Sequence, residues 1–482
     1  MVQNKQKQTV QMLDFKLLQT QIDKNQKKAV YIQIADNIIE LIKNGRLKTG
    51  ELIPGTRQVA AELSINRNTV VQAFDVLSAE GWIISKERKR THVSDKIRIS
   101  PVIERKRQVK QPIEAGRQRP VFFDDGLPNT SCAPMEELAR AYRRIFNSKA
   151  RWQIMNLASE FGDDRFRDMI SNMLNQNRGM NTSLPEICIT RGSQMALFLT
   201  AHCLLKKDDI ILVENPGFKP AWKTFEHAGA RILPVPVDDE GINVEEVESF
   251  IKRENVKAVY LTPHHQYPTT VTLSLARRLR LIELSNLYGF TIIEDDYDNV
   301  FHFSQRPIMP ISSYDTISKN NYIYIGTLSK LIAPAIRVGY IVASSDFIER
   351  VGQLRKIIDI QGDAIMEQSI MELIADGAIR RHQKRMLSYY EQKRDFFVSL
   401  LDNYLGSKVT YKIPDGGLAF WVKPIENIDL FQVQKKTNLK SISFYTPDRF
   451  SFDEPISGIR LGYASLSESD LEKGIKVLNK VL

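Results

Sequence analysis

The chain has 482 residues, a length that predicts two or three domains. Its content of 43% hydrophobic and 26% charged residues is typical of a soluble globular protein. No apolar run approaches the roughly 20 residues that span a bilayer, and the N-terminus MVQNKQKQTVQ lacks the apolar segment of a signal peptide, so we expect a cytoplasmic protein with no membrane partner. The three cysteines are not at metal-ligand spacing, and they predict neither a disulfide framework nor a zinc site.

The net charge of +10 is concentrated at one end of the chain. Residues 1–120 hold 23 Lys and Arg against 12 Asp and Glu, a net charge of +11, whereas residues 121–482 hold 44 against 45, a net charge of −1. A basic face is often only a solvated surface, but segregation this complete favours a polyanionic partner for the N-terminal part.

Residues 29–94 follow a pattern of three helices and a hairpin, after a Gln- and Lys-rich stretch, residues 1–28, that we interpret as an N-terminal arm or an additional strand. The first helix ends near Gly45, and Thr56 is the expected cap of the short second helix. We expect the three buried faces to consist of Ile34, Ile38, Leu41 and Ile42, of Val59, Ala60 and Leu63, and of Val70, Phe74 and Leu77. With the hairpin WIISKERKRTHV, this pattern predicts a winged helix-turn-helix, whose recognition helix reads the major groove of DNA.

The order and spacing of these elements resemble the DNA-binding domain of the GntR family. The landmarks that carry the resemblance are Tyr31, Gly45, Gly50, Leu52, Pro54, Arg57, Ala60, Arg67, Asn68, Thr69, Val70, Leu77, Glu80 and Gly81. The resemblance implies contacts to the phosphates and base edges of double-stranded DNA from Arg57, Arg67, Asn68 and Thr69, and from the wing residues Arg88, Lys89, Arg90 and Thr91. The sequence departs from the family at Gly55, where Ser is usual, and in a wing that is basic rather than glycine-rich. A helical protein-interaction module is the alternative, and the charge segregation favours DNA.

Residues 95–120 are rich in Lys, Arg and Pro and predict an extended basic linker, whose charges either contact the DNA backbone or are merely solvated. Residues 121–482 alternate helical and β-type segments and form one predicted effector domain. Continuous apolar runs occur at 210–213, 256–261, 291–293, 322–325 and 338–342. They predict a parallel sheet covered by helices on both faces, with the ligand at the carboxyl ends of the strands.

The segment YIGTLSKLIAPAIRVGY, residues 324–340, carries the candidate for covalent cofactor attachment. Lys330 follows the hydroxyl residues Thr327 and Ser329, and Arg337 comes seven residues later. Pyridoxal 5'-phosphate (PLP) needs a lysine for its Schiff base, and hydroxyls and an arginine suit its phosphate. A surface lysine and a structural arginine are the alternative. The segment resembles the lysine motif of fold-type I aminotransferases, in the form found in MocR/GabR-type transcriptional regulators of the GntR family.

The resemblance extends to two further motifs of the cofactor pocket. Gly192, Ser193 and Gln194 follow a predicted strand and open a helix, and they correspond to the turn that binds the cofactor phosphate. Phe218 corresponds to the aromatic residue that stacks on the PLP ring. Pro220 stands where some members have an arginine for the substrate carboxylate, which argues against a known effector such as γ-aminobutyrate.

Two motifs contain candidate polar neighbours of the cofactor. In LTPHHQYP, His265 and Gln266 are expected either in the cofactor pocket or in a structural role. In TIIEDDYDNVF, the resemblance gives Asp295 the place opposite the pyridine nitrogen and makes Tyr297 a donor to the ring oxygen. An acidic metal-binding loop is the alternative, but no matching ligand set occurs elsewhere, so no metal is expected. In GIRLGYASL, Arg460 corresponds to the residue that binds an effector carboxylate.

The resemblance implies a PLP-dependent transcriptional regulator, made of a winged helix and an aminotransferase-like domain with large and small subdomains. PLP would form an internal aldimine with Lys330, and an amino acid or amine effector would displace the lysine and change the DNA-bound state. Such proteins are homodimers, often head to tail, that engage paired half-sites. Two alternatives remain open: an active aminotransferase with an added DNA-binding domain, and a regulator for which PLP itself is the signal.

Overall fold

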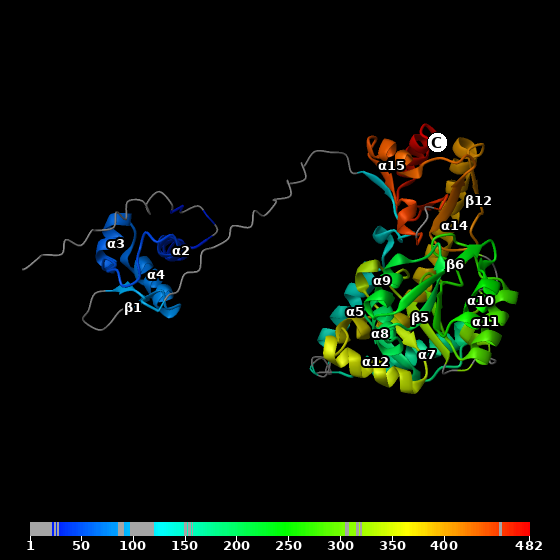
Figure 1. The fold of residues 1–482 in the computed structure, drawn as a ribbon, viewed down its shortest axis with the longest axis horizontal. Coiled ribbons are helices and arrows are strands. Elements are labelled where there is room, and N and C mark those ends of the chain that lie inside the picture. Colours follow the sequence, from blue (N-terminus) through cyan, green and yellow to red (C-terminus); the bar gives the residue numbers. More distant parts are fainter. Residues whose placement is uncertain are drawn as a thin grey trace, which may run out of the picture. The chain divides into compact units, whose positions relative to one another are not determined.

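The computed structural model describes residues 22–23, 26, 28–84, 91–96, 120–148, 152, 156, 158–303, 308–314, 318, 321–452 and 456–482. The chain divides into two compact units, Met1–Ile113 and Glu114–Leu482, and each is described by itself (Figure 1). The predicted arm, apart from residues 22, 23, 26 and 28, and residues 97–119 of the predicted linker lie outside the described residues. Within the described ranges, no helix is long and apolar enough to cross a membrane.

The first unit is a three-helix domain with a two-stranded wing, as the sequence predicts. Its elements are α2 (Val30–Lys43), α3 (Thr56–Leu63), α4 (Arg67–Ala79) and the antiparallel strands β1 (Ile83–Ile84) and β2 (His92–Val93). The predicted face residues of all three helices are buried in one core, except Leu41, which is partly buried against it.

The starts of α3 and α4 are capped in different ways. Asn66 caps α4, since its side chain accepts a hydrogen bond from the main-chain N–H of Asn68 at 2.9 Å. The prediction that Thr56 caps α3 is wrong. Thr56 is the first helical residue, and Gly55, which has no side chain to accept a hydrogen bond, occupies the N-cap position.

The second unit is built on an eight-stranded sheet with the order β4-β11-β10-β9-β8-β5-β6-β7. The strands are β4 (Ile187–Thr190), β5 (Ile210–Asn215), β6 (Arg231–Asp238), β7 (Gly241–Ile242), β8 (Val256–Leu261), β9 (Thr291–Asp296), β10 (Tyr322–Thr327) and β11 (Gly339–Val342). The central strands β6, β5, β8, β9 and β10 are parallel, as predicted. Strand β11 corrects the prediction that residues 338–342 extend the parallel set, because it runs antiparallel to β10 and β4. The connection from β10 contains no crossover helix, and a parallel return needs one.

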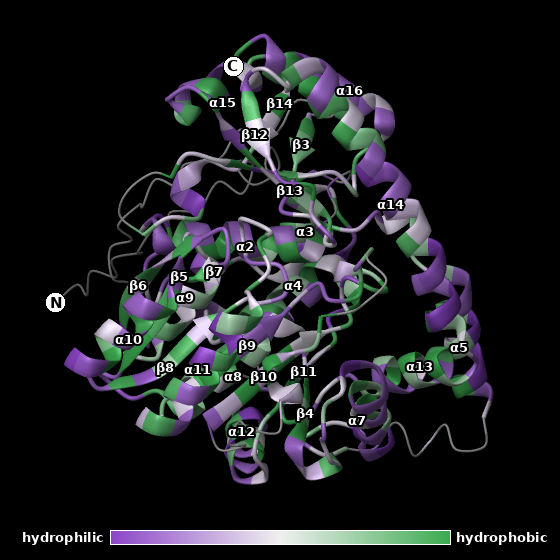
Figure 2. Ribbon diagram, turned by 90° about the vertical axis from the view of Figure 1, so that its right-hand side faces the viewer, coloured by the Kyte–Doolittle hydropathy of each residue, from purple (hydrophilic) through white to green (hydrophobic). Residues whose placement is uncertain are grey.

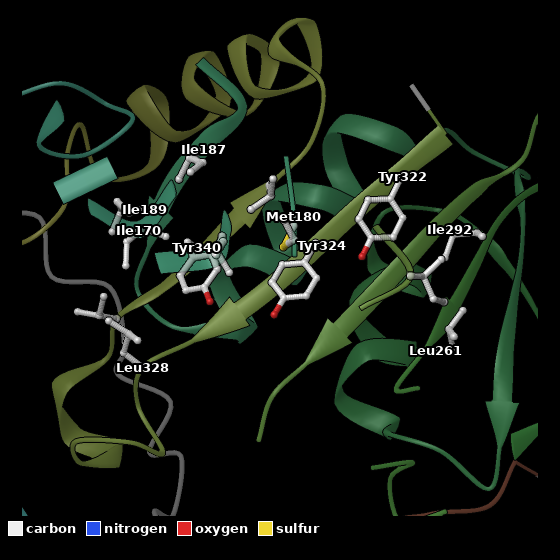
Figure 3. Packing of buried hydrophobic residues seen from close by; sticks show 14 of the residues in the cluster. Ile170, Met180, Ile187, Ile189, Leu261, Ile292, Tyr322, Tyr324, Leu328 and Tyr340 are labelled. Atoms are coloured by element: carbon white, nitrogen blue, oxygen red, sulfur yellow. The ribbon is translucent and has the colours of Figure 1, made fainter. Parts of the chain in front are cut away.

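Helices cover both faces of this sheet. Alternate residues of β5 enter different cores, with Ile210 and Leu212 on one face and Ile211 and Val213 on the other. The first core includes residues of α7 (Asp164–Arg178), α10 (Val244–Arg253), α11 (Leu275–Tyr288) and α13 (Ala364–Ala375). The second includes residues of α8 (Ser193–Leu204), α9 (Lys219–His227) and α12 (Ser345–Ile358). Figure 3 shows the first core near β10 and β11, where three tyrosine side chains lie among aliphatic residues.

A smaller subdomain completes the second unit and has its own core. It contains α14 (Ala378–Leu405), α15 (Leu430–Asn438), α16 (Glu468–Asn479) and the antiparallel strands β12 (Val409–Tyr411), β13 (Ala419–Pro424) and β15 (Ile459–Gly462). The long helix α14 alternates between hydrophilic and hydrophobic residues (Figure 2), and Phe397, Leu400 and Leu401 on it are buried in this core. Strand β3 (Val121–Phe123) pairs in parallel with β14 (Ile442–Phe444), which joins the start of the unit to its last third. Helix α5 (Met135–Asn147) packs on α13.

Candidate functional site

The first turn of α4 presents polar side chains on the surface of the first unit. Arg67 and Asn68 are exposed and Thr69 is partly buried, while Arg57 is exposed on α3. In the wing, Thr91 is partly buried. The other predicted DNA contacts, Arg88, Lys89 and Arg90, lie outside the described residues.

The second unit contains a cavity of about 220 Å³ at the carboxyl ends of its parallel strands. Strand β8 contributes Tyr260, β9 contributes Asp295 and β10 contributes Thr327, and the first residue of α8, Ser193, lies at the same edge. Eight of the predicted cofactor residues line this cavity: Ser193, Phe218, Asp295, Tyr297, Thr327, Ser329, Lys330 and Arg337. Residues that are up to 144 positions apart in the sequence therefore meet in one site.

The side chain of Lys330 is largely enclosed, with its amine close to an acid and an aromatic ring. Nζ of Lys330 lies 3.9 Å from Oδ2 of Asp298 and 4.5 Å from the centroid of the Tyr297 ring. Burial lowers the pKa of Lys330, and the negative charge of Asp298 opposes that shift. A lowered pKa increases the fraction of neutral amine, which is the form that attacks a carbonyl carbon.

Asp295 is the carboxylate of the TIIEDDYD segment that lines the cavity. Its Oδ2 accepts a hydrogen bond from the Tyr260 hydroxyl at 2.9 Å, while no described residue hydrogen-bonds its Oδ1. Burial raises the pKa of Asp295 to about 7. The neighbours Glu294 and Asp296 have other partners, since Glu294 accepts from the N–H of Ile311 at 2.9 Å and Asp296 accepts from Arg178 at 2.6 Å.

The start of α8 and Arg337 form a concave, donor-rich end of the site. Gly192 precedes α8 with a φ of +78°, and a Cβ atom at this position would lie only 2.5 Å from Nη2 of Arg337. Arg337 itself has a φ of +53° and donates from Nη2 to the carbonyl of Arg191 at 3.2 Å. The open main-chain N–H groups at a helix start and a guanidinium group together suit a phosphate.

The hydroxyl residues before Lys330 hold its loop in place. The Thr327 hydroxyl donates to the carbonyl of Val338 at 3.0 Å and accepts from the N–H of Ser329 at 3.1 Å. Thr327 and Ser329 also line the cavity.

Gly192 does not line the cavity, and neither do four predicted residues whose side chains form hydrogen bonds elsewhere. Gln194 donates to the Thr224 hydroxyl at 2.9 Å, and Gln266 donates to the carbonyls of Pro216 and Tyr267, both at 2.7 Å. Nδ1 of His265 lies 2.8 Å from Oδ1 of Asp298. These contacts indicate that Gln194 connects α8 to α9 and that His265 and Gln266 hold the loops around the site.

Arg460 is the fourth of these residues and is buried beside the cavity. Its Nε donates to the carbonyl of Asp125 at 3.0 Å and its Nη1 donates to the carbonyl of Pro268 at 2.7 Å. Its guanidinium carbon lies 4.9 Å from the centroid of the Tyr267 ring, and Nη2 lies 3.5 Å from the Tyr297 hydroxyl.

Two family models match the chain. The model of aminotransferase class I and II matches residues 129–478, which is more than half of the chain. The chain belongs to this family. The model of bacterial regulatory proteins of the gntR family matches residues 30–93. A GntR helix-turn-helix joined to an aminotransferase-family domain is the MocR-type architecture that the sequence predicts.

Named relatives share this arrangement over nearly their whole length. The HTH-type transcriptional regulator YdeL of Bacillus subtilis is 28% identical over 93% of this chain and 96% of YdeL. The protein named probable rhizopine catabolism regulatory protein MocR, from Rhizobium meliloti, is 25% identical over 95% of this chain and 94% of MocR. Among solved structures, the kynurenine aminotransferase of Pyrococcus horikoshii, crystallised in complex with PMP, is 26% identical with a TM-score of 0.70, covering 76% of this chain and 91% of the enzyme.

Several lining residues of this MocR-type chain escape sequence reasoning. Tyr260 and Thr262 lie at the end of β8, and Tyr267 and Asp125 complete the wall. Tyr260 belongs to an apolar strand and is expected in the core on that basis. Asp125 lies far from the other motifs in the sequence, and its Oδ2 accepts from the Tyr267 hydroxyl at 3.0 Å. Among these lining residues, only Tyr267 has a feature in the sequence that indicates the site, namely its position before a proline.

Proposed function

We propose that this chain is a DNA-binding transcriptional regulator that senses an amino acid or amine through PLP held at Lys330. The observation that carries the proposal is the cavity. It contains an enclosed lysine, a buried carboxylate with one oxygen that no described residue hydrogen-bonds, and a donor-rich end, in a chain that also carries a GntR-type helix-turn-helix. The cavity suits a cofactor and the helix-turn-helix suits DNA. A sensor that controls DNA binding accounts for both.

The residues of the cavity fit PLP from end to end. Oδ1 of Asp295 lacks a described partner and would accept the N–H of the pyridine ring. The start of α8 and Arg337 would hold the phosphate, and Phe218 would lie against the ring. Lys330 would hold the cofactor covalently. When bound, PLP supplies an electrophilic carbon for amines and an electron-withdrawing ring.

The effector end of the site is formed by Arg460 and its neighbours. Two of its nitrogen atoms donate to main-chain carbonyls, which fixes the guanidinium group, and Nη2 is directed toward Tyr297 beside the cavity. A fixed guanidinium group beside the reactive lysine suits an effector that carries a carboxylate. A homodimer, with two winged helices on paired half-sites, completes the proposed regulator.

An active aminotransferase is the second candidate, since solved aminotransferases of known activity share the fold of the second unit. The two candidates differ in the chemistry that takes place once an effector is bound. A sensor stops with the effector attached, whereas an aminotransferase transfers the amino group and releases a keto acid.

The test is a titration of the full-length protein, loaded with PLP, against a panel of amino acids and amines. The visible absorption spectrum and the mobility of bound promoter DNA are followed in the same samples. A sensor gives a stable spectral change and a DNA-binding change at the same effector concentration. Conversion to the pyridoxamine form, reversed by a keto acid and without any effect on DNA binding, would favour the enzyme. A DNA response to PLP alone, with no response to any amine, would identify PLP as the signal.

A further inference from the structure

Next to Lys330 lies a buried pair formed by Asp298 and His265, neither of which lines the cavity. Both side chains are 2% exposed or less. Nδ1 of His265 lies 2.8 Å from Oδ1 of Asp298, which leaves Oδ2 facing Nζ of Lys330 at 3.9 Å. No described residue hydrogen-bonds this Oδ2. A buried carboxylate oxygen without a donor is costly, so the position calls for a cation.

The smaller subdomain closes this pair off from solvent. A Cβ atom at Gly417 would lie 3.0 Å from Oδ2 of Asp298, and one at Gly416 would lie 2.6 Å from Nε2 of His265. The turn therefore packs its main chain directly on the pair, which leaves no room for a larger side chain. In such an enclosed position the attraction between a carboxylate and an ammonium is stronger than at a surface.

Other charges near Lys330 are already engaged. Asp124 accepts hydrogen bonds from the N–H groups of Gly126 and Leu127, both at 2.8 Å. Asp125 accepts from the Tyr267 hydroxyl and from Arg449 at 3.3 Å. Arg460 adds a positive charge that disfavours an ammonium at Lys330, and these three groups together with Asp298 and burial set the pKa of Lys330.

We propose that Asp298, oriented by His265, is the counter-ion that receives Lys330 as an ammonium whenever Nζ is not bound to the cofactor. Asp298 is therefore a positioning residue, which acts through Lys330. Burial alone would raise the pKa of Asp298, but the charges of His265 and Lys330 reverse this and hold it at about 2, so the carboxylate is ionised at neutral pH.

This counter-ion has a consequence for sensing, which rests on the proposed function. An effector ammonium that took the place of Lys330 on bound PLP would release Nζ beside Asp298. The protons that leave the effector nitrogen are those that Nζ gains, so the exchange is balanced without another acid. Asp298 stabilises the released ammonium and thereby favours the effector-bound state. We therefore expect the wild-type protein, in which Asp298 and His265 are both present, to bind its effector tightly.

The test measures the pKa of Lys330 in full-length protein freed of cofactor. A brief pulse of an amine-acylating reagent at a series of pH values, followed by mass spectrometry of the Lys330 peptide, gives this pKa. In Asp298→Asn we expect a pKa lower by about one unit, seen as roughly tenfold faster acylation at low pH. Glu214→Gln is the matched control. Glu214 is a buried carboxylate of the same unit that accepts from Thr262 at 2.7 Å, and it is not one of the charges named above as setting the pKa of Lys330, so its loss should leave that pKa unchanged.

His265→Gln provides a second variant if Asp298→Asn fails to fold, and it should raise the pKa of Lys330, because it removes the positive charge that competes with Lys330 for Asp298. An unchanged pKa of Lys330 in a folded Asp298→Asn or His265→Gln protein would overturn the proposal. So would an equal shift in Glu214→Gln. Because the measurement uses cofactor-free protein, its outcome does not depend on the proposed function. The proposed function is contradicted by a different result, a wild-type protein that does not bind PLP at Lys330.

Discussion

At the scale of single residues, the buried carboxylate of Asp295 lowers the stability of the cofactor-free protein, and the same carboxylate is the proposed acceptor for the cofactor ring. The pKa of Asp295 is raised from 3.8 to about 7 by burial, so between these pH values the folded state binds a proton that the unfolded chain has lost. The free energy of unfolding of the cofactor-free protein therefore falls as the pH rises through this window. A pyridinium group would neutralise the carboxylate and remove this cost.

Asp295→Asn tests that account. At pH 8 the cofactor-free variant should be more stable than the wild type by roughly 1–3 kcal/mol, because an amide carries no charge to bury. At pH 4 the difference should largely disappear, and PLP should bind at least about tenfold more weakly, since the ring nitrogen loses its acceptor. Denaturant unfolding at the two pH values and a PLP titration measure these effects. A variant less stable than the wild type at pH 8 would contradict the account.

The residues found from the sequence and those that escape it differ in a physical way. Asp295 stands out because carboxylates at the end of an apolar strand are costly to bury and imply a partner, whereas Lys330 stands out through the hydroxyls and the arginine of its motif. Tyr260 has no such signal, because a tyrosine in a strand is ordinary core material until the fold sets its hydroxyl 2.9 Å from Asp295. The pairing of Asp298 with His265 depends on two loops that meet only in three dimensions.

At the scale of elements, the strands of the parallel sheet are found from continuous apolar runs, and the run at 256–261 coincides with β8. The antiparallel direction of β11 cannot be predicted from its apolar run, because such a run has the same pattern in a parallel and in an antiparallel strand. The direction is set by the connection after β10, in which Pro334 and the short turn around it leave no crossover helix.

The turn into α8 gives a prediction at this scale. In Gly192→Ala, the new methyl group would occupy the place of the Arg337 guanidinium group, so we expect PLP to bind at least about tenfold more weakly. Gly289→Ala is the matched control, because Gly289 has a similar φ of +76° and no atom within 4 Å of the added carbon. Gly289→Ala should lose about 1 kcal/mol of stability through backbone strain, and Gly192→Ala should lose more, because its ψ of 174° lies in a region that only glycine adopts readily. Equal PLP affinity in the two variants, measured by titration, would exclude the assigned role of the turn.

The first turn of α4 gives a second prediction. Arg67 is exposed at the start of the predicted recognition helix, and Arg67→Ala should weaken DNA binding by about 1–3 kcal/mol. Arg46→Ala removes the same charge from an exposed position after α2 and should have a much smaller effect. Fluorescence anisotropy with a DNA fragment that the wild type binds, at two salt concentrations, separates the two variants. If both lose affinity equally, binding depends on the net charge of the unit and not on α4.

At the scale of the whole molecule, the distribution of charge and chemistry assigns the two units different tasks. The excess of positive charge lies in residues 1–120, while residues 121–482 are nearly neutral and contain the cavity. The division is evident from composition and motifs alone. The two units are coupled if the DNA affinity of the first unit differs between two states of the cavity in the second. A ligand shifts the population of these states only if it binds one of them more tightly than the other.

The most direct test of the account is a comparison of wild type and Lys330→Ala as full-length proteins with added PLP. The wild type should develop the visible band of lysine-bound PLP, and borohydride should fix the cofactor to the Lys330 peptide. Lys330→Ala should show only the spectrum of free PLP, while its basal affinity for DNA stays within about twofold of the wild type, because no part of the winged helix is altered. A wild type without the band, or a folded Lys330→Ala protein that no longer binds DNA, would contradict the account.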